Sequence, residues 1–374
     1  MGRPTLNSVA EAAAVSRQTV SNVINSPEVV SPETRERVLA AIERLGYRPN
    51  TAARQMRTTR SQIIGLCIPP SGNGVSGVVL DQFLHSLTAT AERYDHRIML
   101  FTAADDEAET RAYADLIASV GIDGFVLTNT HHDDLRTRWL LERELPFVTF
   151  GRPWGAEDTH PWVDVDGAAG TRLATDHLIR QGHRRIAFVG WPEGSGSGDD
   201  RRAGWAAGLA AAGLGEGPQA AVFDGVEGGR SAAARLLDAG GAAESGDGGV
   251  ANDSFATSGV PNESFATRAA TPGGGGRAAH PAGSGTPTAF VCASDSLALG
   301  VTAELRDRGI RPGADASVIG FDDTPTAAVL GLSSVAQPIA DVAAECVRQL
   351  RTILRGEPEP ATTLFTPHLV LRTT

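Results

Sequence analysis

The spacing of the hydrophobic positions changes near residue 61 of the chain. Before that point, apolar residues recur at helical spacing in three short stretches, each preceded by a hydroxyl residue that can cap a helix. Thr5 can cap the first helix, Ser16 the second and Ser31 the third, which Gly46 can end. These features predict a small all-α core at the N-terminus.

The side chains expected to face that core are apolar and lie about one turn apart. They are Val9 and Ala12 in the first stretch, Val20, Val23 and Ile24 in the second, and Val38, Ile42 and Leu45 in the third. Residues 49–60 follow, with a possible cap at Asn50 and Met56 as their one large apolar residue. We expect this segment to be ordered only with a partner, because a short helix without an apolar face is marginal in water.

From residue 61, continuous apolar runs alternate with helical stretches. The runs are 63–69, 97–103, 124–129, 146–151, 185–190, 220–225, 288–294 and 317–323, and helical patterns such as 80–94, 108–119, 167–181 and 296–308 separate them. This alternation predicts parallel sheets covered by helices on both faces. Because so many units exceed one comfortable doubly wound sheet, we expect two similar α/β lobes, with a ligand cleft at the carboxyl ends of the strands.

Residues 240–287 interrupt the alternation. They contain runs of glycine and a small tandem duplication, NDSFATSGVP followed by NESFATRAATP. Such a composition cannot bury a core, and two copies are too few to stack. We expect a disordered surface insert; a recognition or processing segment is the alternative.

The charge of the chain is strongly polarised. Residues 1–60 hold nine Arg against five Glu, a balance of +4, so the remainder carries −15 and the whole chain −11. A basic head on an acidic body places the attraction to phosphate at one end. Every basic residue is Arg, which suits bidentate contacts to phosphate and guanine, although compositional bias explains the missing Lys equally well.

Several classes of protein are disfavoured by what the sequence lacks. Cys67, Cys292 and Cys346 lie far apart in apolar contexts, which favours reduced core thiols over disulfides or a metal site. No apolar run approaches membrane-spanning length, and the N-terminus lacks a secretory apolar region, so we expect a cytoplasmic, nucleoid-associated protein. No G-x-S-x-G, P-loop or H-E-x-x-H motif is present, and His131–His132 is typical of a polar loop, so we expect no enzyme.

The opening block, TLNSVAEAAAVSRQTVSNVINSPEVVSPETRERVLAAIERLGYRPN, closely resembles the DNA-binding head of the LacI/GalR family of bacterial repressors. The resemblance continues in IIGLCIPP, GHRRIAFVG, RRAGWAAGL, ASDSLALG, SVIGFDD and AQPIADVA, and only residues 240–287 stand clearly outside it. It implies a helix-turn-helix head at 1–48, a hinge at 49–60, and a two-lobed periplasmic-binding-protein-like sensor at 61–374. Within the sensor we expect lobe 1 at about 61–161 and 322–337, and lobe 2 at about 162–321 and 338–374.

A recognition helix reads base edges with its N-terminal end, and here that end carries polar side chains suited to bases. Arg17 can hold guanine and Gln18 adenine in bidentate fashion. Together with the resemblance, this predicts a set of DNA-contacting residues in the head and hinge. The set is Thr5, Leu6, Ser16, Arg17, Gln18, Ser21, Asn22, Asn25, Ser31, Thr34, Asn50, Ala53, Arg54 and Met56.

The resemblance implies a specific role for the hinge. Met56 corresponds to the apolar residue that family members wedge into the minor groove at the centre of a palindromic site. Ala53 is small enough for two hinge helices to approach, and Asn50 and Arg54 can reach phosphate or base edges. An exposed or core-packed methionine is the alternative for Met56.

Two positions of the head depart from the family pattern. Ala14 stands where the family usually has Gly, which is tolerable if its φ stays negative. Asn22 stands where Arg is frequent, so the base preference of this chain need not match that of its relatives.

In the body, the resemblance implies an effector site, most plausibly for a sugar. Arg201 and Asp322 match residues that hold effector hydroxyls, with a structural salt bridge as the alternative. Ser294 and Asp295 follow a strand, and Asp295 could instead be only a helix N-cap. Four residues of the first lobe complete the predicted pocket: Ser71, Asn73, Arg152 and Trp154.

The expected protein is a repressor that binds a palindromic operator in double-stranded DNA as a homodimer. A small-molecule effector, expected to be a sugar, would alter that binding, and no cofactor, metal or membrane is implied. The rival hypothesis is a regulator of the same fold whose effector is not a sugar, is a protein, or is absent.

Overall fold

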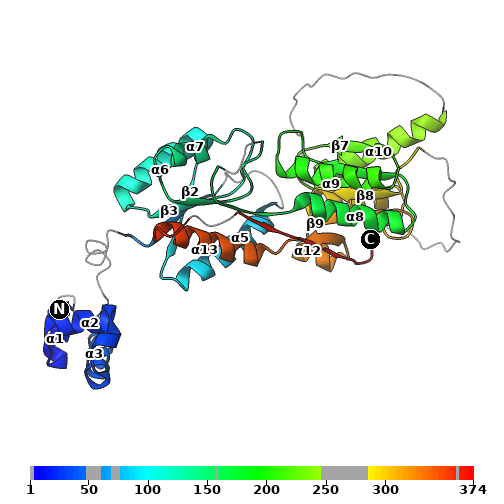
Figure 1. The fold of residues 1–374 in the computed structure, drawn as a ribbon. Helices are drawn as coiled ribbons and strands as arrows, with labels where there is room; N and C mark the ends of the chain where they lie inside the picture. Colours follow the sequence, from blue (N-terminus) through cyan, green and yellow to red (C-terminus); the bar gives the residue numbers. More distant parts are fainter. Residues whose placement is uncertain (1–3, 48–59, 69–75, 156–158, 246–284, 359–361) are drawn as a thin grey trace, which may run out of the picture. The chain divides into compact units, whose positions relative to one another are not determined.

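The computed structural model describes residues 4–47, 60–68, 76–155, 159–245, 285–358 and 362–374 (Figure 1). The N-terminal head and the body that begins at Ile63 are separate compact units. The head consists of α1 (Leu6–Ala13), α2 (Arg17–Asn25), the short 3₁₀ helix η1 (Pro27–Val29) and α3 (Pro32–Leu45). Its core contains Val9, Val20, Val23, Val38, Ala41 and Tyr47.

The three predicted helix caps of the head are confirmed. The hydroxyls of Thr5, Ser16 and Ser31 each accept a hydrogen bond from a backbone N–H in the first turn of the helix that follows. Gly46 ends α3 in the left-handed conformation, with φ of 60°. These caps pair backbone donors and acceptors that a short helix would otherwise leave unsatisfied at its ends.

Two expectations for α1 were wrong. Ala12 is exposed and Ala13 is buried instead, because the face of α1 toward the core runs through Val9, Ala10 and Ala13. Ala14 does not keep a negative φ: it ends α1 in the left-handed conformation, with φ of 52°. A Cβ is strained in that conformation, which explains why Gly is suited to this turn.

The first lobe of the body is built on a six-stranded sheet with the order β11-β5-β4-β3-β1-β2. Its strands are β1 (Ile63–Ile68), β2 (Arg97–Thr102), β3 (Gly124–Leu127), β4 (Phe147–Phe150), β5 (Trp162–Val165) and β11 (Thr363–Phe365), all paired in parallel. Figure 1 shows α6 (Asp106–Val120) and α7 (Leu135–Leu141) over one face, and α5 (Ser76–Glu92) and α13 (Ile339–Leu354) over the other.

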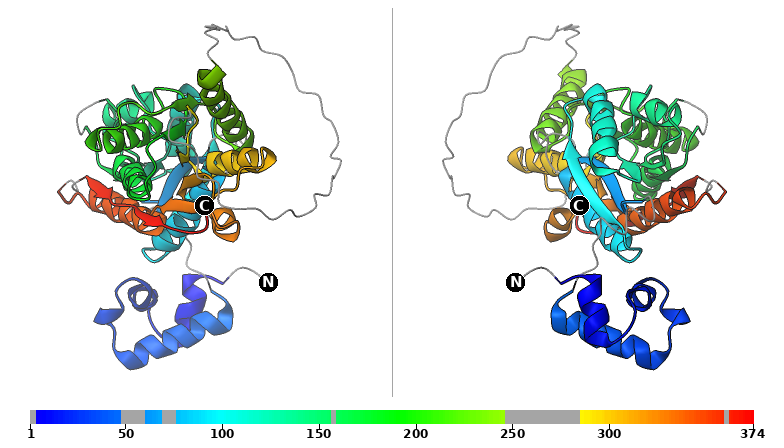
Figure 2. Two further views of the ribbon diagram at one scale, coloured as in Figure 1. Left: turned by 90° about the vertical axis from the view of Figure 1, so that its right-hand side faces the viewer. Right: turned by 90° about the vertical axis from the view of Figure 1, so that its left-hand side faces the viewer.

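The second lobe repeats this plan with the order β12-β10-β9-β8-β6-β7. Its strands are β6 (Ile186–Gly190), β7 (Gln219–Ala221), β8 (Ala289–Cys292), β9 (Ser317–Asp322), β10 (Ser333–Ala336) and β12 (His368–Val370), and only β12 pairs antiparallel. Its helices are α8 (Gly167–Arg180), α9 (Ser197–Ala211), α10 (Val226–Ser245), α11 (Asp295–Asp307) and α12 (Pro325–Val329). Figure 2 shows the pair α8 and α9 on one face and the pair α10 and α11 on the other.

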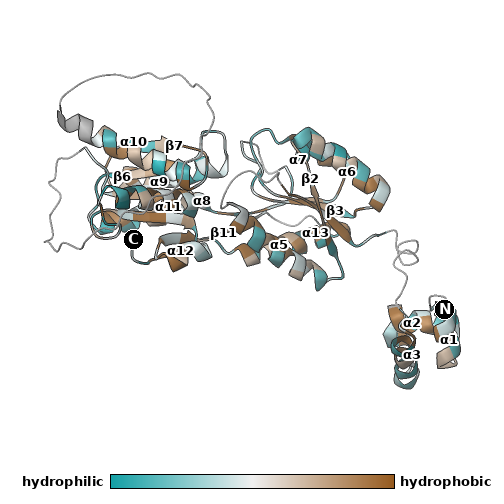
Figure 3. Cartoon of the chain, turned by 180° about the vertical axis from the view of Figure 1, so that it is seen from behind, coloured by the Kyte–Doolittle hydropathy of each residue, from teal (hydrophilic) through white to brown (hydrophobic). Residues whose placement is uncertain are grey.

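Each lobe has its own hydrophobic core. The strands are among the most apolar elements (Figure 3), as expected for sheets covered on both faces. In the first lobe, Ile64 and Leu66 of β1 belong to the same buried cluster as Val347 and Leu350 of α13. The predicted α/β architecture with two lobes of parallel strands is therefore confirmed.

The predicted division of the C-terminal residues between the lobes was wrong. Residues 322–337 were assigned to lobe 1, but β10 lies in the sheet of lobe 2 and pairs with β9. Residues 338–374 were assigned to lobe 2, but α13 and β11 belong to the core and sheet of lobe 1. The chain crosses between the lobes three times, after β5, after β10 and after β11, because each sheet takes its outer strand from the C-terminal segment.

The predicted insert begins later than expected. Residues 240–245 are the last turn and a half of α10, because Ala242, Ala243 and Glu244 favour continuation of the helix. A Cβ on Gly240 would lie 2.5 Å from the backbone of Thr286, so the glycine permits the returning chain to pass close to the helix. The rest of the predicted insert, up to residue 284, lies outside the described residues.

In the parts of the chain that the structure describes, we find no helix with the length and apolar character needed to cross a membrane.

Substituting Ala14→Gly should stabilise the head by about 0.5–1 kcal/mol, because glycine adopts a positive φ without the strain of a Cβ. The matched control is Ala12→Gly, an exposed position within α1, which should lower the stability of the head by a similar amount. Native-state hydrogen exchange of the α2 amides in the intact protein measures both changes. Faster exchange in the Ala14→Gly protein would contradict the left-handed assignment.

Candidate functional site

The N-terminal end of α2 presents a polar face. The side chains of Arg17 and Gln18 are exposed, and those of Ser21 and Asn22 are partly exposed. The amide of Gln18 donates to Oδ1 of Asn22 at 2.9 Å, so these two side chains form one hydrogen-bonding unit on the surface of the helix. Such a face offers donors and acceptors suited to base edges in a major groove.

The opposite face of α2 holds it to the rest of the head. Val20 and Val23 are buried in the core, and Ser16 accepts from the backbone N–H of Thr19 at 3.0 Å. The helix can therefore not rotate without exposing its apolar side chains. This packing determines which side chains of α2 face outward.

The other predicted contacts of the head lie at helix ends. Thr5 and Ser31 cap α1 and α3, where free backbone N–H groups suit phosphate oxygens, and Ser31 donates to the hydroxyl of Thr34 at 3.0 Å. Leu6 packs against the core of the head. Asn25 is the last residue of α2, and its side chain is outside the described structure.

Six predicted residues lie outside the described residues altogether. They are Asn50, Ala53, Arg54 and Met56 of the hinge, and Ser71 and Asn73 of the first lobe. Their roles stay predictions.

In the body, the second lobe gathers polar side chains at the carboxyl edge of its sheet. Arg201 reaches this edge from α9, Asp322 ends β9, and Ser294 and Asp295 lie in the turn between β8 and α11. The strands that lead to these residues, β6, β8 and β9, are neighbours in the sheet, so four residues spread over more than a hundred positions meet at one edge. Ligands of open parallel sheets bind at this edge.

The guanidinium of Arg201 is buried and only partly satisfied. Its Nη1 donates to the carbonyl oxygen of Ala293 at 2.5 Å and lies 3.8 Å from Oδ1 of Asp322. The group also lies 3.8 Å from the ring centroid of Phe321, which favours a cation–π contact. Its Nε is buried without an acceptor among the described residues, so it remains available to a ligand.

Asp322 is a buried carboxylate held in an unusual backbone conformation. Its φ is 114°, which is strained for a residue with a Cβ. The amide of Gln337 donates to its Oδ1 at 2.7 Å. Burial raises the pKa of Asp322 to about 7, against the attraction of Arg201, which acts to lower it. At 3.8 Å, Arg201 and Asp322 are beyond hydrogen-bond distance, so neither group satisfies the hydrogen-bonding capacity of the other.

Ser294 and Asp295 have different environments. Ser294, not Asp295, is the N-cap of α11, so the alternative assignment of Asp295 as the cap was wrong. The fully buried carboxylate of Asp295 accepts from the backbone N–H of Thr324 at 2.7 Å and from the hydroxyl of Ser334 at 2.6 Å. Asp295 thereby positions the turn that follows Asp322.

The analysis of the sequence missed Asp224. Its Oδ1 accepts from the hydroxyl of Ser294 at 2.5 Å and from the indole of Trp191 at 3.2 Å. Its Oδ2 is buried without a partner among the described residues, as is Nε of Arg201. The available signal was its place in the apolar run 220–225, three residues after β7 ends, which brings it to the same sheet edge.

On the first lobe, Arg152 is bound by two carboxylates. Its Nε donates to Asp164 of β5 at 2.8 Å, and its Nη2 donates to Asp200 of α9 at 2.9 Å. Asp200 also accepts from the backbone N–H of Ala168 in the second lobe. Arg152 therefore links the two lobes directly beside Arg201.

Trp154 also lies where the lobes meet. Its ring is 4.7 Å from the guanidinium of Arg152, and a Cβ on Gly196 of the second lobe would approach it to 2.6 Å. On the first lobe, Trp154 lines a cavity of about 220 Å³ together with Thr130 and His131. The structure thus brings Arg201, Asp322, Ser294 and Asp295 together, and places Arg152 and Trp154 on the facing lobe.

Comparison with known proteins gives three matches to family profiles. Residues 5–50 match bacterial regulatory proteins of the lacI family, residues 79–260 match the periplasmic binding proteins and sugar binding domain of the LacI family, and residues 248–374 match a periplasmic binding protein-like domain.

Individual relatives match along nearly the whole chain. The HTH-type transcriptional regulator CelR of Thermobifida fusca is 32% identical, with 99% of this chain and 98% of that regulator covered. A solved complex of a transcriptional regulator CelR with cellobiose has a TM-score of 0.67 and 28% identity, and covers 99% of both chains. The lac repressor dimer bound to operator has a TM-score of 0.74 at 24% identity over 100% of this chain and 99% of that one, which supports the fold alone. The chain therefore belongs to the lacI family of bacterial regulatory proteins and is a DNA-binding transcriptional regulator, not an enzyme.

Proposed function

We propose that this regulator is a repressor whose affinity for operator DNA is controlled by a sugar bound at the carboxyl edge of the second lobe. The observation that carries this proposal is the pair of buried atoms without partners, Nε of Arg201 and Oδ2 of Asp224, beside the separated Arg201–Asp322 pair. A sugar offers adjacent hydroxyls that can both donate and accept. A bound sugar can therefore accept a hydrogen bond from Nε of Arg201 and donate one to Oδ2 of Asp224. Each of these bonds is favourable because a buried polar atom without a partner is costly.

The balance of charge favours a neutral ligand. Three carboxylates, those of Asp322, Asp224 and Asp200, act on Arg201, and Arg152 is the partner of Asp200, so carboxylates outnumber guanidinium groups in this set. A phosphorylated or carboxylated ligand would add repulsion, whereas a neutral polyol would not. The CelR complex with cellobiose supports the same class of ligand.

Operator binding as a dimer is the second part of the proposal. The solved lac repressor is a dimer on its operator. In the second lobe of this chain, several large apolar side chains are exposed, including Phe223 at 78% and Val329 at 86%, and such side chains suit contact with a second copy. Two heads would then meet two half-sites of a palindrome about one helical turn apart.

In this proposal, movement of the two lobes about the three chain crossings couples sugar binding to DNA binding. A ligand that contacts both lobes changes their preferred separation, because it replaces or reinforces the link from Arg152 to Asp200. The change in operator affinity then equals the difference in the affinity of the ligand for the two states.

The direct test is binding of the purified protein to DNA from its own upstream region, at fixed salt, with and without a panel of neutral mono- and disaccharides. We expect one sugar to change the affinity for DNA, and the direction of the change identifies inducer or corepressor. Binding to DNA that no sugar alters would instead support a regulator with another effector or none.

Substituting Arg201→Ala should abolish the response to the active sugar, with an affinity for that sugar at least about tenfold lower, while DNA binding without sugar is retained. The matched control is Arg202→Ala, because Arg202 pairs with Glu193 and Asp199 and not with the site. Calorimetric titration with the sugar measures the difference. Equal affinities of the two variants for the sugar would show that Arg201 does not contribute to sugar binding.

The affinity for the sugar should rise as the pH increases through about 7. The reason is that burial raises the pKa of Asp322 to that value, and the ionised carboxylate accepts hydrogen bonds from hydroxyls better than the protonated acid. An Asp322→Asn variant should bind more weakly and lose most of this dependence between pH 6 and 8. A variant that keeps the full pH dependence would show that another group titrates.

Substituting Arg17→Ala should weaken specific DNA binding by about 1–3 kcal/mol and non-specific binding much less, since Arg17 is predicted to contact a base. Arg37→Ala is the control of equal charge change, because Arg37 is exposed on α3 and pairs with Glu33 at 4.0 Å. Fluorescence anisotropy with upstream and scrambled duplexes separates the two effects. Equal losses on both duplexes would assign Arg17 to the phosphate backbone.

A further inference from the structure

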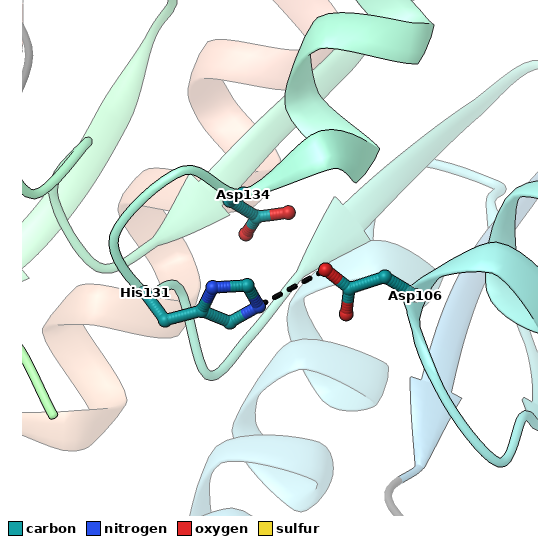
Figure 4. Close-up of side chains that lie close together, drawn as sticks. All are labelled: Asp106, His131 and Asp134. Atoms are coloured by element: carbon teal, nitrogen blue, oxygen red, sulfur yellow. Dashed lines mark ion pairs between the residues drawn. The ribbon is translucent and has the colours of Figure 1, made fainter. Parts of the chain in front are cut away.

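A group of possible metal ligands lies at the carboxyl edge of the first sheet, on the other lobe from the proposed sugar site. Asp106 begins α6, His131 lies in the loop between β3 and α7, and Asp134 is the N-cap of α7. One ligand atom from each lies within 4.8 Å of the other two, and Nε2 of His131 is 3.1 Å from Oδ2 of Asp106 (Figure 4). No pattern in the sequence indicated this group, because its members come from separate segments.

The ring of His131 is oriented as in a metal ligand. Its Nδ1 lies 3.0 Å from the carbonyl oxygen of His132, to which a ring N–H can donate, and its Nε2 faces Oδ2 of Asp106 at 3.1 Å, where a bound metal ion would take the place of a proton between the two atoms. Histidines that bind metals commonly donate their second ring N–H to a carbonyl or carboxylate, which fixes the tautomer.

The charges around this group do not balance. Glu109 and Asp134 are buried at 8% and 6% side-chain exposure, and Asp106 is 25% exposed. The one arginine that pairs with all three carboxylates is Arg136, which is also buried. When His131 is in the neutral form that binds a metal, two negative charges are left in this largely buried setting, and an additional cation would stabilise them.

Arg136 leaves the ligand positions usable. Oδ1 of Asp134 accepts from the backbone N–H of Arg136 at 3.0 Å and from its Nε at 2.9 Å, whereas Oδ2 accepts from Nη2 at 2.7 Å and keeps a second lone pair for a metal ion. The contact of Arg136 with Asp106 is longer, 3.6 Å, and is made to the oxygen that does not face His131. Arg136 thus orients Asp134, as outer partners of metal ligands do.

We propose that Asp106, His131 and Asp134 bind a divalent transition-metal ion of the zinc class. One imidazole nitrogen and two carboxylate oxygens are a donor set that such ions accept, whereas calcium and magnesium prefer oxygen alone. His131 and Asp134 also line the cavity of about 220 Å³, which gives the ion room for water ligands. The ion would join the start of α6 to the start of α7 and hold the loop of the first lobe that lies beside Trp154.

The test is calorimetric titration of Zn²⁺ into the full-length protein after treatment with a chelator. We expect a site of one Zn²⁺ per chain with Kd in the micromolar range or below, and an affinity at least about tenfold lower in His131→Ala. The matched control is His132→Ala, the exposed neighbour in the same loop, which should bind as the wild type does. No site of this strength in the wild type, or equal affinities in the two variants, would overturn the proposal.

Cobalt substitution identifies the ligands independently of stability. Co²⁺ bound by nitrogen and oxygen should give weak visible bands without the strong near-ultraviolet band of sulfur ligation, which excludes Cys67 as the origin of binding. Asp106→Asn, which keeps the shape of the side chain, should weaken these bands while the circular dichroism of the protein is unchanged. A sulfur band, or an Asp106→Asn spectrum identical to the wild type, would contradict the assignment.

Discussion

The buried guanidinium of Arg201 is the interaction on which the rest of the sensor depends. It is 8% exposed and permanently charged, so the surrounding structure must supply carbonyl and carboxylate partners. The carbonyl oxygen of Ala293 and the carboxylate of Asp322 are such partners, and the ring of Phe321 adds a cation–π contact. Nε of Arg201 still has no acceptor among the described residues. A half-satisfied network of this kind is costly to the free protein and gains from a ligand that completes it.

The same constraint explains how the two lobes are connected. Arg152 of the first lobe bonds Asp200, which is adjacent in sequence to Arg201, and through this contact we propose that a ligand at the buried site acts on the link between the lobes. Three crossings of the chain allow the lobes to move as bodies while each keeps its own core. In the proposed mechanism, control of DNA binding requires only a modest difference in the affinity of the ligand for two arrangements.

Much of the fold could be predicted because its strands are continuous apolar runs. Eight strands were expected from such runs, and the helix caps of the head follow from the hydroxyl residues before each helix. The short strands β11 and β12 have three residues each, and β5 carries Asp164, so their patterns were too weak. The placement of β10 in the second lobe and of α13 in the first depends on pairing and packing between distant segments, which no local pattern reveals.

The candidate sites were predictable to different degrees. Arg201 and Asp322 stood in motifs, whereas Asp224 became visible only once β7 was placed beside β6. The left-handed φ of Ala14 was missed because an alanine gives no local sign of that conformation. Asp106, His131 and Asp134 belong together only through the packing of α6 and α7 on one sheet.

The central claim is that the effector binds at the carboxyl edge of the second sheet and alters the contact between the lobes. Hydrogen–deuterium exchange of the intact protein, with and without the sugar that changes its affinity for DNA, tests this claim most directly. We predict slower exchange in the loops that follow β6, β7, β8 and β9, together with a change around Arg152. Protection confined to segments away from this edge, with these loops unchanged, would contradict the account.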